Sequence, residues 1–112
     1  LFEQLGPEGM RLLSSFCKYA HSKNFLVIMD AKRGDIGSTS QAYANAYLGK
    51  HAPFPSDALT INPWLGLDSL EPFFKKSQET GSGLFVLVHT SNKGSSDIQE
   101  ILVNLDYLNV SH

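Results

Sequence analysis

The sequence has no cysteine pair, no long apolar run and no marked surplus of charge of either sign. A lone cysteine, Cys17, cannot form an internal disulfide, and its place among apolar helix positions predicts a core residue. No apolar stretch approaches the about 20 residues that cross a bilayer, and the start lacks the pattern of a signal peptide. The net charge of −2 comes with scattered lysines and arginines that form no basic stripe. We therefore expect a cytoplasmic protein that binds neither membranes nor nucleic acid.

Motifs for common cofactors are also missing. The sequence contains no G-x-G-x-x-G turn, no Walker phosphate loop and no cysteine–histidine spacing typical of a metal site. These absences argue against a dinucleotide-binding domain and a P-loop enzyme. They also give no indication of a metal site.

The apolar pattern alternates between short continuous runs and helical spacing. Three runs predict buried strands at residues 25–29, 58–61 and 84–88. One helix is expected from Pro7 onward, with His21 in solvent near its end, and another helix after each run. Alternation of this kind predicts a parallel α/β sheet. The polar residues after each strand match the ligand-binding face of a β/α barrel or a doubly wound sheet.

Residues near the expected helix starts indicate how these helices begin. Ser38 and Gln41 have the spacing of a capping box. Pro72 is expected in the first turn of the next helix, where the missing N–H is tolerated. Asp97 is placed to cap a last helix that continues through Leu105.

The length of the chain limits how much of a barrel it can form. A complete (β/α)8 TIM barrel needs eight strand–helix units and about 250 residues. The chain has 112 residues and about three such units. We therefore predict that residues 1–112 form one partial barrel domain, a fragment of a larger barrel, with no second domain.

A charged string, DAKRGDIGST at residues 30–39, directly follows the first apolar run. If strand geometry continues, the period of two places Asp30 and Lys32 on one face, and Asp35 can fold back from the following loop. Two carboxylates beside one ammonium favour its charged form, so we expect Lys32 to donate a proton. The carboxylates would also repel an anionic group, which can leave as a neutral molecule. The string thus fits decarboxylation, but by itself an Asp-x-Lys-x-x-Asp pattern is more often a surface network of ion pairs.

The same string resembles the catalytic signature of orotidine 5'-phosphate decarboxylase, in the form found in the type 2 branch of that family. Residues 60–69 (TINPWLGLDS) and 83–92 (GLFVLVHTSN) resemble the next two strand ends of the family, in order. The resemblance implies a cofactor-free β/α barrel. It also implies a lyase that converts orotidine 5'-phosphate to UMP and carbon dioxide in de novo pyrimidine biosynthesis, and a homodimer with shared active sites.

By matching position, the resemblance implies a role for four residues of the string. Lys32 would protonate C6 of the pyrimidine as the carboxylate departs. Asp30 would hold Lys32 and help to bind the ribose, and Asp35 would complete the charged array. Asp35 and Thr39 would reach into the pocket of the partner subunit, so all four are expected to contact substrate.

Further substrate contacts are expected after the second and third strands. Ser91 resembles the family serine that contacts the pyrimidine ring, with Thr90 and Asn92 beside it. Asn62 is another candidate contact, although an Asn-Pro pair is also a common turn. Trp64 is expected to pack rather than to stack on a base.

Several groups of the family have no counterpart in the sequence. In the family, a second catalytic lysine and a ribose-binding aspartate belong to earlier strands. The glutamine and arginine that hold the phosphate belong to later loops. None of these can be placed here, so we expect this chain alone to be inactive or nearly so.

Three alternatives fit parts of the pattern. Metal-dependent sugar-phosphate decarboxylases and hexulose-phosphate synthases of the same superfamily share Asp-x-Lys-x-x-Asp, but the run after Lys32 points to the metal-free enzyme. A Schiff-base aldolase would need a neutral lysine, which Asp30 and Asp35 oppose. The third alternative is a folding remnant or interaction module without catalysis. Whatever its function, an isolated three-unit piece is expected to expose apolar strand edges and helix faces, and therefore to associate.

Overall fold

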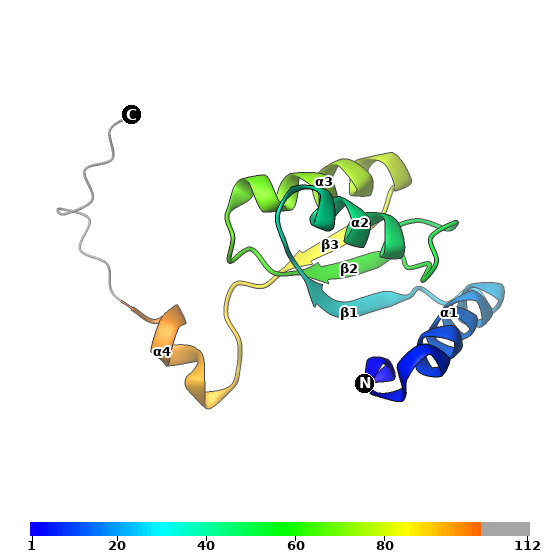
Figure 1. The fold of residues 1–112 in the computed structure, drawn as a ribbon, viewed down its shortest axis with the longest axis horizontal. Helices are drawn as coiled ribbons and strands as arrows, with labels where there is room; N and C mark the ends of the chain where they lie inside the picture. The colour runs from blue at the N-terminus through cyan, green and yellow to red at the C-terminus, as the bar shows by residue number, and fades with distance from the viewer. Residues whose placement is uncertain (102–112) are drawn as a thin grey trace.

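A three-stranded parallel sheet with helices packed on it forms the centre of the molecule (Figure 1). The computed structural model describes residues 1–101. Its strands follow the order β1-β2-β3, so neighbours in the sequence are neighbours in the sheet. The elements are η1 (Phe2–Leu5), α1 (Gly6–Ser22), β1 (Ile28–Arg33), α2 (Gly37–Tyr47), β2 (Ala58–Ile61), α3 (Leu67–Thr80), β3 (Gly83–Val86), η2 (Lys93–Ser95) and α4 (Ser96–Gln99). The predicted parallel α/β arrangement is confirmed.

Helices α2 and α3 lie side by side over one face of this sheet (Figure 1). Phe73 of α3 and Leu59 and Ile61 of β2 are fully buried between the layers. Cys17 of α1 belongs to the same apolar cluster and is 1% exposed, which confirms its predicted place in the core. Burial raises the pKa of the Cys17 thiol, so the less reactive protonated form is favoured.

Strand β1 begins at Ile28 rather than at Phe25 and continues to Arg33. The Val27 N–H donates to the Asp57 carboxylate at 2.7 Å, and pairing with β2 starts only at Ile28. Phe25 lies before the sheet with its side chain exposed. Apolar character alone therefore placed the start of this strand too early.

A half-buried contact between a histidine and a carboxylate ties the end of α1 to the start of β2. His21 Nε2 lies 2.8 Å from Asp57 Oδ2, and Asp57 also accepts the Val27 N–H. Burial acts to raise the pKa of Asp57, but the Val27 hydrogen bond and His21 hold this pKa below its usual value. The expectation that His21 faces solvent is wrong, because the loop before β2 brings a carboxylate to the end of the helix.

The starts of α2 and α3 differ from the predictions. Helix α2 begins at Gly37, and its N-cap residue makes no side-chain capping hydrogen bond. The Ser40 hydroxyl instead donates to the Asp35 carbonyl at 2.6 Å, so the capping box at Ser38 is wrong. Helix α3 begins at Leu67, which places Pro72 inside the helix and beyond its first turn.

The segment after β3 is less regular than expected. Strand β3 ends at Val86, and the chain then runs away from the sheet to η2 and α4 (Figure 1). Helix α4 ends at Gln99, and Ile101 is not helical. The rest of the predicted last helix, to Leu105, lies outside the described residues.

Apolar side chains remain exposed along the sheet edges and on α1. Ile28 of β1 is 58% exposed, Phe85 of β3 is 53% exposed, and Phe16 of α1 is 60% exposed. Both β1 and β3 are edge strands within residues 1–101. The predicted exposure of apolar strand edges and helix faces is thus confirmed. None of the helices in this range has the length and apolar character that a bilayer crossing requires.

Candidate active site

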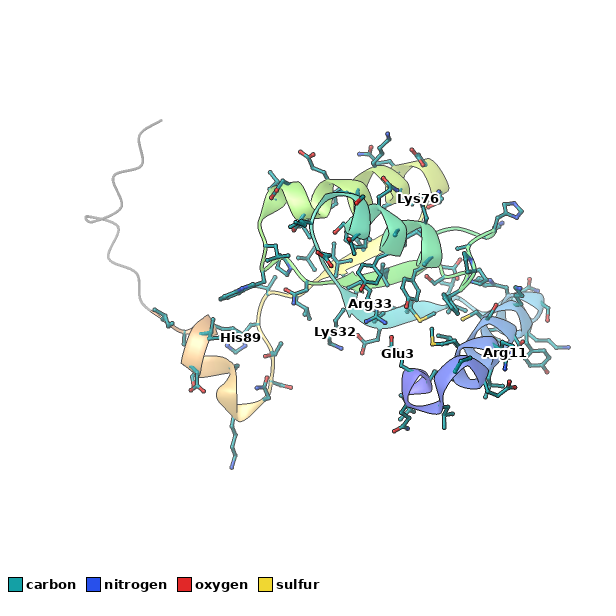
Figure 2. The ribbon with its side chains drawn as sticks, in the orientation of Figure 1. Glu3, Arg11, Lys32, Arg33, Lys76 and His89 are labelled. Atoms are coloured by element: carbon teal, nitrogen blue, oxygen red, sulfur yellow. The ribbon has the colours of Figure 1, made fainter. Side chains whose placement is uncertain are left out.

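The carboxyl end of β1 carries an ion pair between Asp30 and Lys32 (Figure 2 labels Lys32). Lys32 Nζ lies 2.6 Å from Asp30 Oδ1, and the two side chains are 50% and 65% exposed, respectively. The period of two in a strand predicted that Asp30 and Lys32 lie on the same face. Because both groups are open to solvent, a ligand can reach them without any movement of the sheet.

Strand β1 bulges at the position of this pair. Met29 pairs with Leu59 and Arg33 pairs with Ile61, so three residues of β1 lie opposite Thr60 alone. Lys32 has a positive φ of 49°, a backbone conformation that few residues other than glycine adopt. The bulge interrupts the regular pairing of β1 with β2 at the position of Asp30 and Lys32. Bulges often occur next to active sites.

Thr60 of β2 supplies a hydroxyl that touches both charged residues. It accepts the Lys32 N–H at 2.9 Å and donates to Asp30 Oδ1 at 2.9 Å. Sequence reasoning missed this residue. The available signal was that Thr60 is the one polar side chain in the strand Ala58–Ile61.

The electrostatics of the pair favour a fixed negative charge. The hydrogen bond from Lys32, and then that from Thr60, lower the pKa of Asp30 below its usual value. Asp30 is therefore ionised at neutral pH and serves as the counter-ion of the ammonium. A lysine held in this way can donate a proton to a group placed above it.

Asp35 does not join the pair within the described part of the chain. Its Oδ1 accepts the Ile36 N–H at 2.7 Å, and its main chain is held by Ser40. The loop turns into α2 at Gly37, whose φ of 47° suits glycine, and Asp35 makes no ion pair with Lys32 within residues 1–101. Asp30 and Lys32 thus come together as predicted, while Asp35 does not fold back onto them.

The residues after β2 form a turn close to the end of β1. The Asn62 N–H donates to the Arg33 carbonyl at 2.9 Å, and its Oδ1 accepts the Trp64 N–H at 3.0 Å. A side chain at Gly34 would place its Cβ 2.7 Å from the Asn62 carbonyl oxygen, so only glycine fits this approach. Trp64 is 70% exposed, so the packing expected for it is not seen within residues 1–101.

The predicted contacts after β3 lie in a segment that bonds mainly to itself. The Thr90 hydroxyl donates to Asn92 Oδ1 at 2.6 Å, and its N–H donates to Gln99 Oε1 at 2.7 Å. Ser91 is exposed. No hydrogen bond joins residues 89–101 to the sheet, and this segment lies apart from β1 (Figure 1). The structure therefore does not bring Ser91, Thr90 or Asn92 onto Lys32.

Arg33 takes a different direction from the lysine beside it. Its guanidinium lies 5.4 Å from the ring centre of Tyr43 and 5.8 Å from that of Tyr47, and it pairs with Glu3. It also lies 3.3 Å from the Tyr47 hydroxyl. Arg33 thus joins β1 to α2 and η1, a structural role that the sequence did not reveal.

Comparison with known proteins identifies the family. The model of the orotidine 5'-phosphate decarboxylase / HUMPS family matches residues 1–111. An orotidine 5'-phosphate decarboxylase of Rhodopirellula baltica is 50% identical over 107 residues, which are 92% of this chain and 35% of the relative. The chain thus spans about a third of the length of this relative.

Solved structures agree with the sequence comparison. A protein of Streptomyces avermitilis superposes with a TM-score of 0.85 at 48% identity, over 88% of this chain and 35% of that protein. The Leishmania donovani OMP decarboxylase superposes with a TM-score of 0.78 at 42% identity, over 91% of this chain and 38% of its own. These solved structures are TIM barrels, and residues 1–101 form three consecutive strand–helix units of such a barrel. The chain belongs to the orotidine 5'-phosphate decarboxylase / HUMPS family.

Proposed function

We propose that this chain is the central part of an orotidine 5'-phosphate decarboxylase that forms UMP and carbon dioxide in pyrimidine biosynthesis. The observation that carries the proposal is the Asp30–Lys32 pair at the carboxyl end of β1, in a chain of this family. A relative that is 50% identical over 92% of the chain bears the name of this enzyme. The protein is proposed to act in the cytoplasm, and residues 1–112 to be one partial domain.

The charges at the pair suit this reaction. Asp30 repels a substrate carboxylate held beside it, and the repulsion ends when that group leaves as neutral carbon dioxide. The bond between C6 and the carboxylate breaks, and its electron pair stays on C6 near the positive charge of Lys32. Lys32 Nζ then gives its proton to C6, and the neutral amine regains a proton from water. Because side chains and water supply every proton and charge in these steps, we propose a cofactor-independent enzyme.

Asn62, Ser91, Thr90 and Asn92 are proposed substrate contacts of the longer protein. All four follow strands, at the end where barrel enzymes bind their substrates. Segments outside this chain would supply the second lysine, the ribose-binding aspartate and the groups that hold the phosphate. The chain alone is therefore proposed to be inactive.

The active form is proposed to be a homodimer with shared sites. Asp35 and Thr39 lie where β1 turns into α2, and Thr39 is exposed. Asp35 makes no ion pair within residues 1–101. Both side chains are thus available to the pocket of a second subunit.

Release of carbon dioxide from orotidine 5'-phosphate by the full-length protein tests the proposal. We expect release together with formation of UMP, at the same rate with and without a chelator of divalent metals. Activity that the chelator abolishes would instead favour the metal-dependent sugar-phosphate enzymes of the superfamily. No release of carbon dioxide from a folded full-length protein would contradict the proposal.

A further inference from the structure

We propose that Thr60 is a positioning residue that orients both Asp30 and Lys32 through its single hydroxyl. The inference rests on the proposed function for its catalytic meaning, but its geometry is independent of the substrate. Thr60 belongs to β2, and the two residues it orients belong to β1. It therefore acts on the charged pair from outside the string that carries that pair.

The first step of the argument is the interrupted ladder between β1 and β2. Between the pairs Met29–Leu59 and Arg33–Ile61, three residues of β1 lie opposite one residue of β2. Three N–H groups cannot all find main-chain partners on a single residue. The Lys32 N–H finds the Thr60 hydroxyl at 2.9 Å instead. A hydroxyl on β2 thus replaces the main-chain acceptor that a regular ladder would provide.

The second step is the conformation of Lys32. Its φ of 49° is unfavourable for a residue other than glycine and persists only where surrounding contacts hold it. The hydrogen bond from the Lys32 N–H to Thr60 is such a contact. Without it, the N–H would lose its protein partner and the backbone could relax. The side chain of Lys32 would then leave its present direction.

The third step is the direction of the hydroxyl proton. Because the Thr60 oxygen accepts the Lys32 N–H, its own proton is free to go to Asp30 Oδ1 at 2.9 Å. The same Oδ1 accepts Lys32 Nζ at 2.6 Å, which closes a ring of three hydrogen bonds. Asp30 Oδ2 makes no hydrogen bond within residues 1–101. One oxygen is held by the protein, and the other stays available to a ligand.

Other charged groups do not compete for Asp30. Glu3 of η1 and Arg33 of β1 line the same cavity of about 420 Å³ as Asp30, but they pair with each other. Strand β2, Ala58–Ile61, contains no charged residue. The partners that hold Asp30 are therefore Lys32 and Thr60.

Two substitutions of Thr60 distinguish the effect of its hydroxyl from the effect of its side-chain shape. Thr60→Val keeps the branched shape but removes the acceptor for Lys32 and the donor to Asp30. Thr60→Ser keeps the hydroxyl and loses only a methyl group. Thr80→Val is the matched control, because the Thr80 hydroxyl donates to the Lys76 carbonyl at 2.8 Å, far along α3 from the pair.

The decisive measurement is the pKa of Asp30 in the full-length protein, followed by carbon-13 NMR of labelled aspartate carboxyls and assigned with Asp30→Asn. Thr60→Val should raise this pKa, because the ionised form loses a hydrogen bond. Thr60→Ser and Thr80→Val should leave it unchanged. In the decarboxylase assay, Thr60→Val should lower kcat about 10- to 100-fold and move the acid limb of the pH profile of kcat to higher pH. The kcat of Thr60→Ser should stay within about three-fold of that of the parent protein. Thr60→Ala repeats the test without the hydroxyl if Thr60→Val fails to fold.

The outcomes distinguish this inference from the proposed function. An unchanged Asp30 pKa in folded Thr60→Val would overturn the role of Thr60, whatever the protein catalyses. So would equal losses of kcat in Thr60→Ser and Thr60→Val. A full-length protein without decarboxylase activity would overturn the proposed function, while the titration would still decide on Thr60.

Discussion

At the scale of single residues, Lys32 and Arg33 are adjacent cations with separate tasks. Lys32 meets Asp30 on the open side of β1, whereas Arg33 packs against the rings of Tyr43 and Tyr47. Successive residues of a strand point to opposite faces, so the two side chains leave β1 in different directions. Arg33 holds the strand to α2, whereas Lys32 is the proposed proton donor.

Lys32→Ala in the full-length protein should lower kcat for decarboxylation by about 100- to 10,000-fold, because the ammonium is the proposed proton source. The fold should survive, since the Lys32 side chain is half exposed. The measurement is release of carbon dioxide under saturating substrate, with circular dichroism for the fold. Lys75→Ala, an exposed lysine of α3, is the control and should keep full activity. Activity of Lys32→Ala within a few-fold of the parent would refute the assignment.

The sequence predicted the charged pair but not its support. Asp30 and Lys32 follow from the period of two in a strand, which is a local rule. Thr60 could not be predicted, because its contact depends on the register between β1 and β2 at a bulge. The segment around Ser91 makes its described contacts locally, and its proposed place at the site depends on parts of a barrel beyond this chain.

At the scale of elements, the attachment of α1 to the sheet depends on Asp57. Its carboxylate accepts the Val27 N–H at 2.7 Å and lies 2.8 Å from His21 Nε2. Sequence reasoning found the helix and strand β2 correctly but could not find this link, because the two residues are 36 positions apart. It also set the start of β1 at Phe25, since a side-chain acceptor for Val27 leaves no trace in the apolar pattern.

Asp57→Asn should lower the free energy of unfolding of the full-length protein by about 1 kcal/mol at pH 7, because the charged partner of two hydrogen bonds is lost. The pKa of Asp57 is lowered in the folded state, so its contribution is present above the unfolded value of about 3.9 and fades as pH falls through the folded value. The difference from the parent should therefore shrink in urea unfolding at pH values below about 4.

Asp68→Asn is the matched control for this change, because the N-terminus of α3 has no side-chain capping hydrogen bond. Its effect on the free energy of unfolding should be small at every pH. A pH-independent loss in Asp57→Asn, equal at pH 7 and pH 3, would contradict the role of the ionised carboxylate.

At the scale of the whole molecule, the chain covers 35% of the length of its Rhodopirellula relative. Edge strands β1 and β3 and the face of α1 carry exposed apolar side chains as a result, among them Ile28, Phe85 and Phe16. The number of strand–helix units and the length were enough to predict a partial barrel. The strand order followed from the alternation of elements, because consecutive units of a barrel are neighbours.

The chain in isolation should therefore self-associate. Unpaired strand edges and apolar faces offer contacts that further barrel units would otherwise occupy. Sedimentation velocity over a range of concentrations should show oligomers or aggregates, whereas the full-length protein as control should give one defined species. A compact monomer that unfolds cooperatively would contradict this expectation.

Mixing of two inactive full-length variants tests the proposed shared sites. If Asp35 serves the partner's pocket, Lys32→Ala and Asp35→Ala subunits should form heterodimers with one site that has both defects and one that has neither. Activity should return to about half per heterodimer, or about a quarter of the parent level after random mixing.

Mixing Lys32→Ala with Asp30→Ala is the control, because both residues are proposed to serve their own chain, so that each site of the heterodimer keeps one defect. It should give no recovery. Subunit exchange is verified by mass spectrometry of the dimers. Exchange without recovery in the first mixture would place Asp35 in the pocket of its own chain.

The hydroxyl of Thr60 also changes what the Lys32 amide reports. In a regular sheet an amide proton is protected by a carbonyl of the next strand, and its exchange with solvent follows the opening of the strands. The Lys32 amide is protected by a side-chain oxygen instead. Rotation of that one side chain exposes the proton to deuterium while β1 and β2 stay paired. Its exchange rate therefore measures how often the hydrogen bond from Lys32 to Thr60 opens, independently of the unfolding of the sheet.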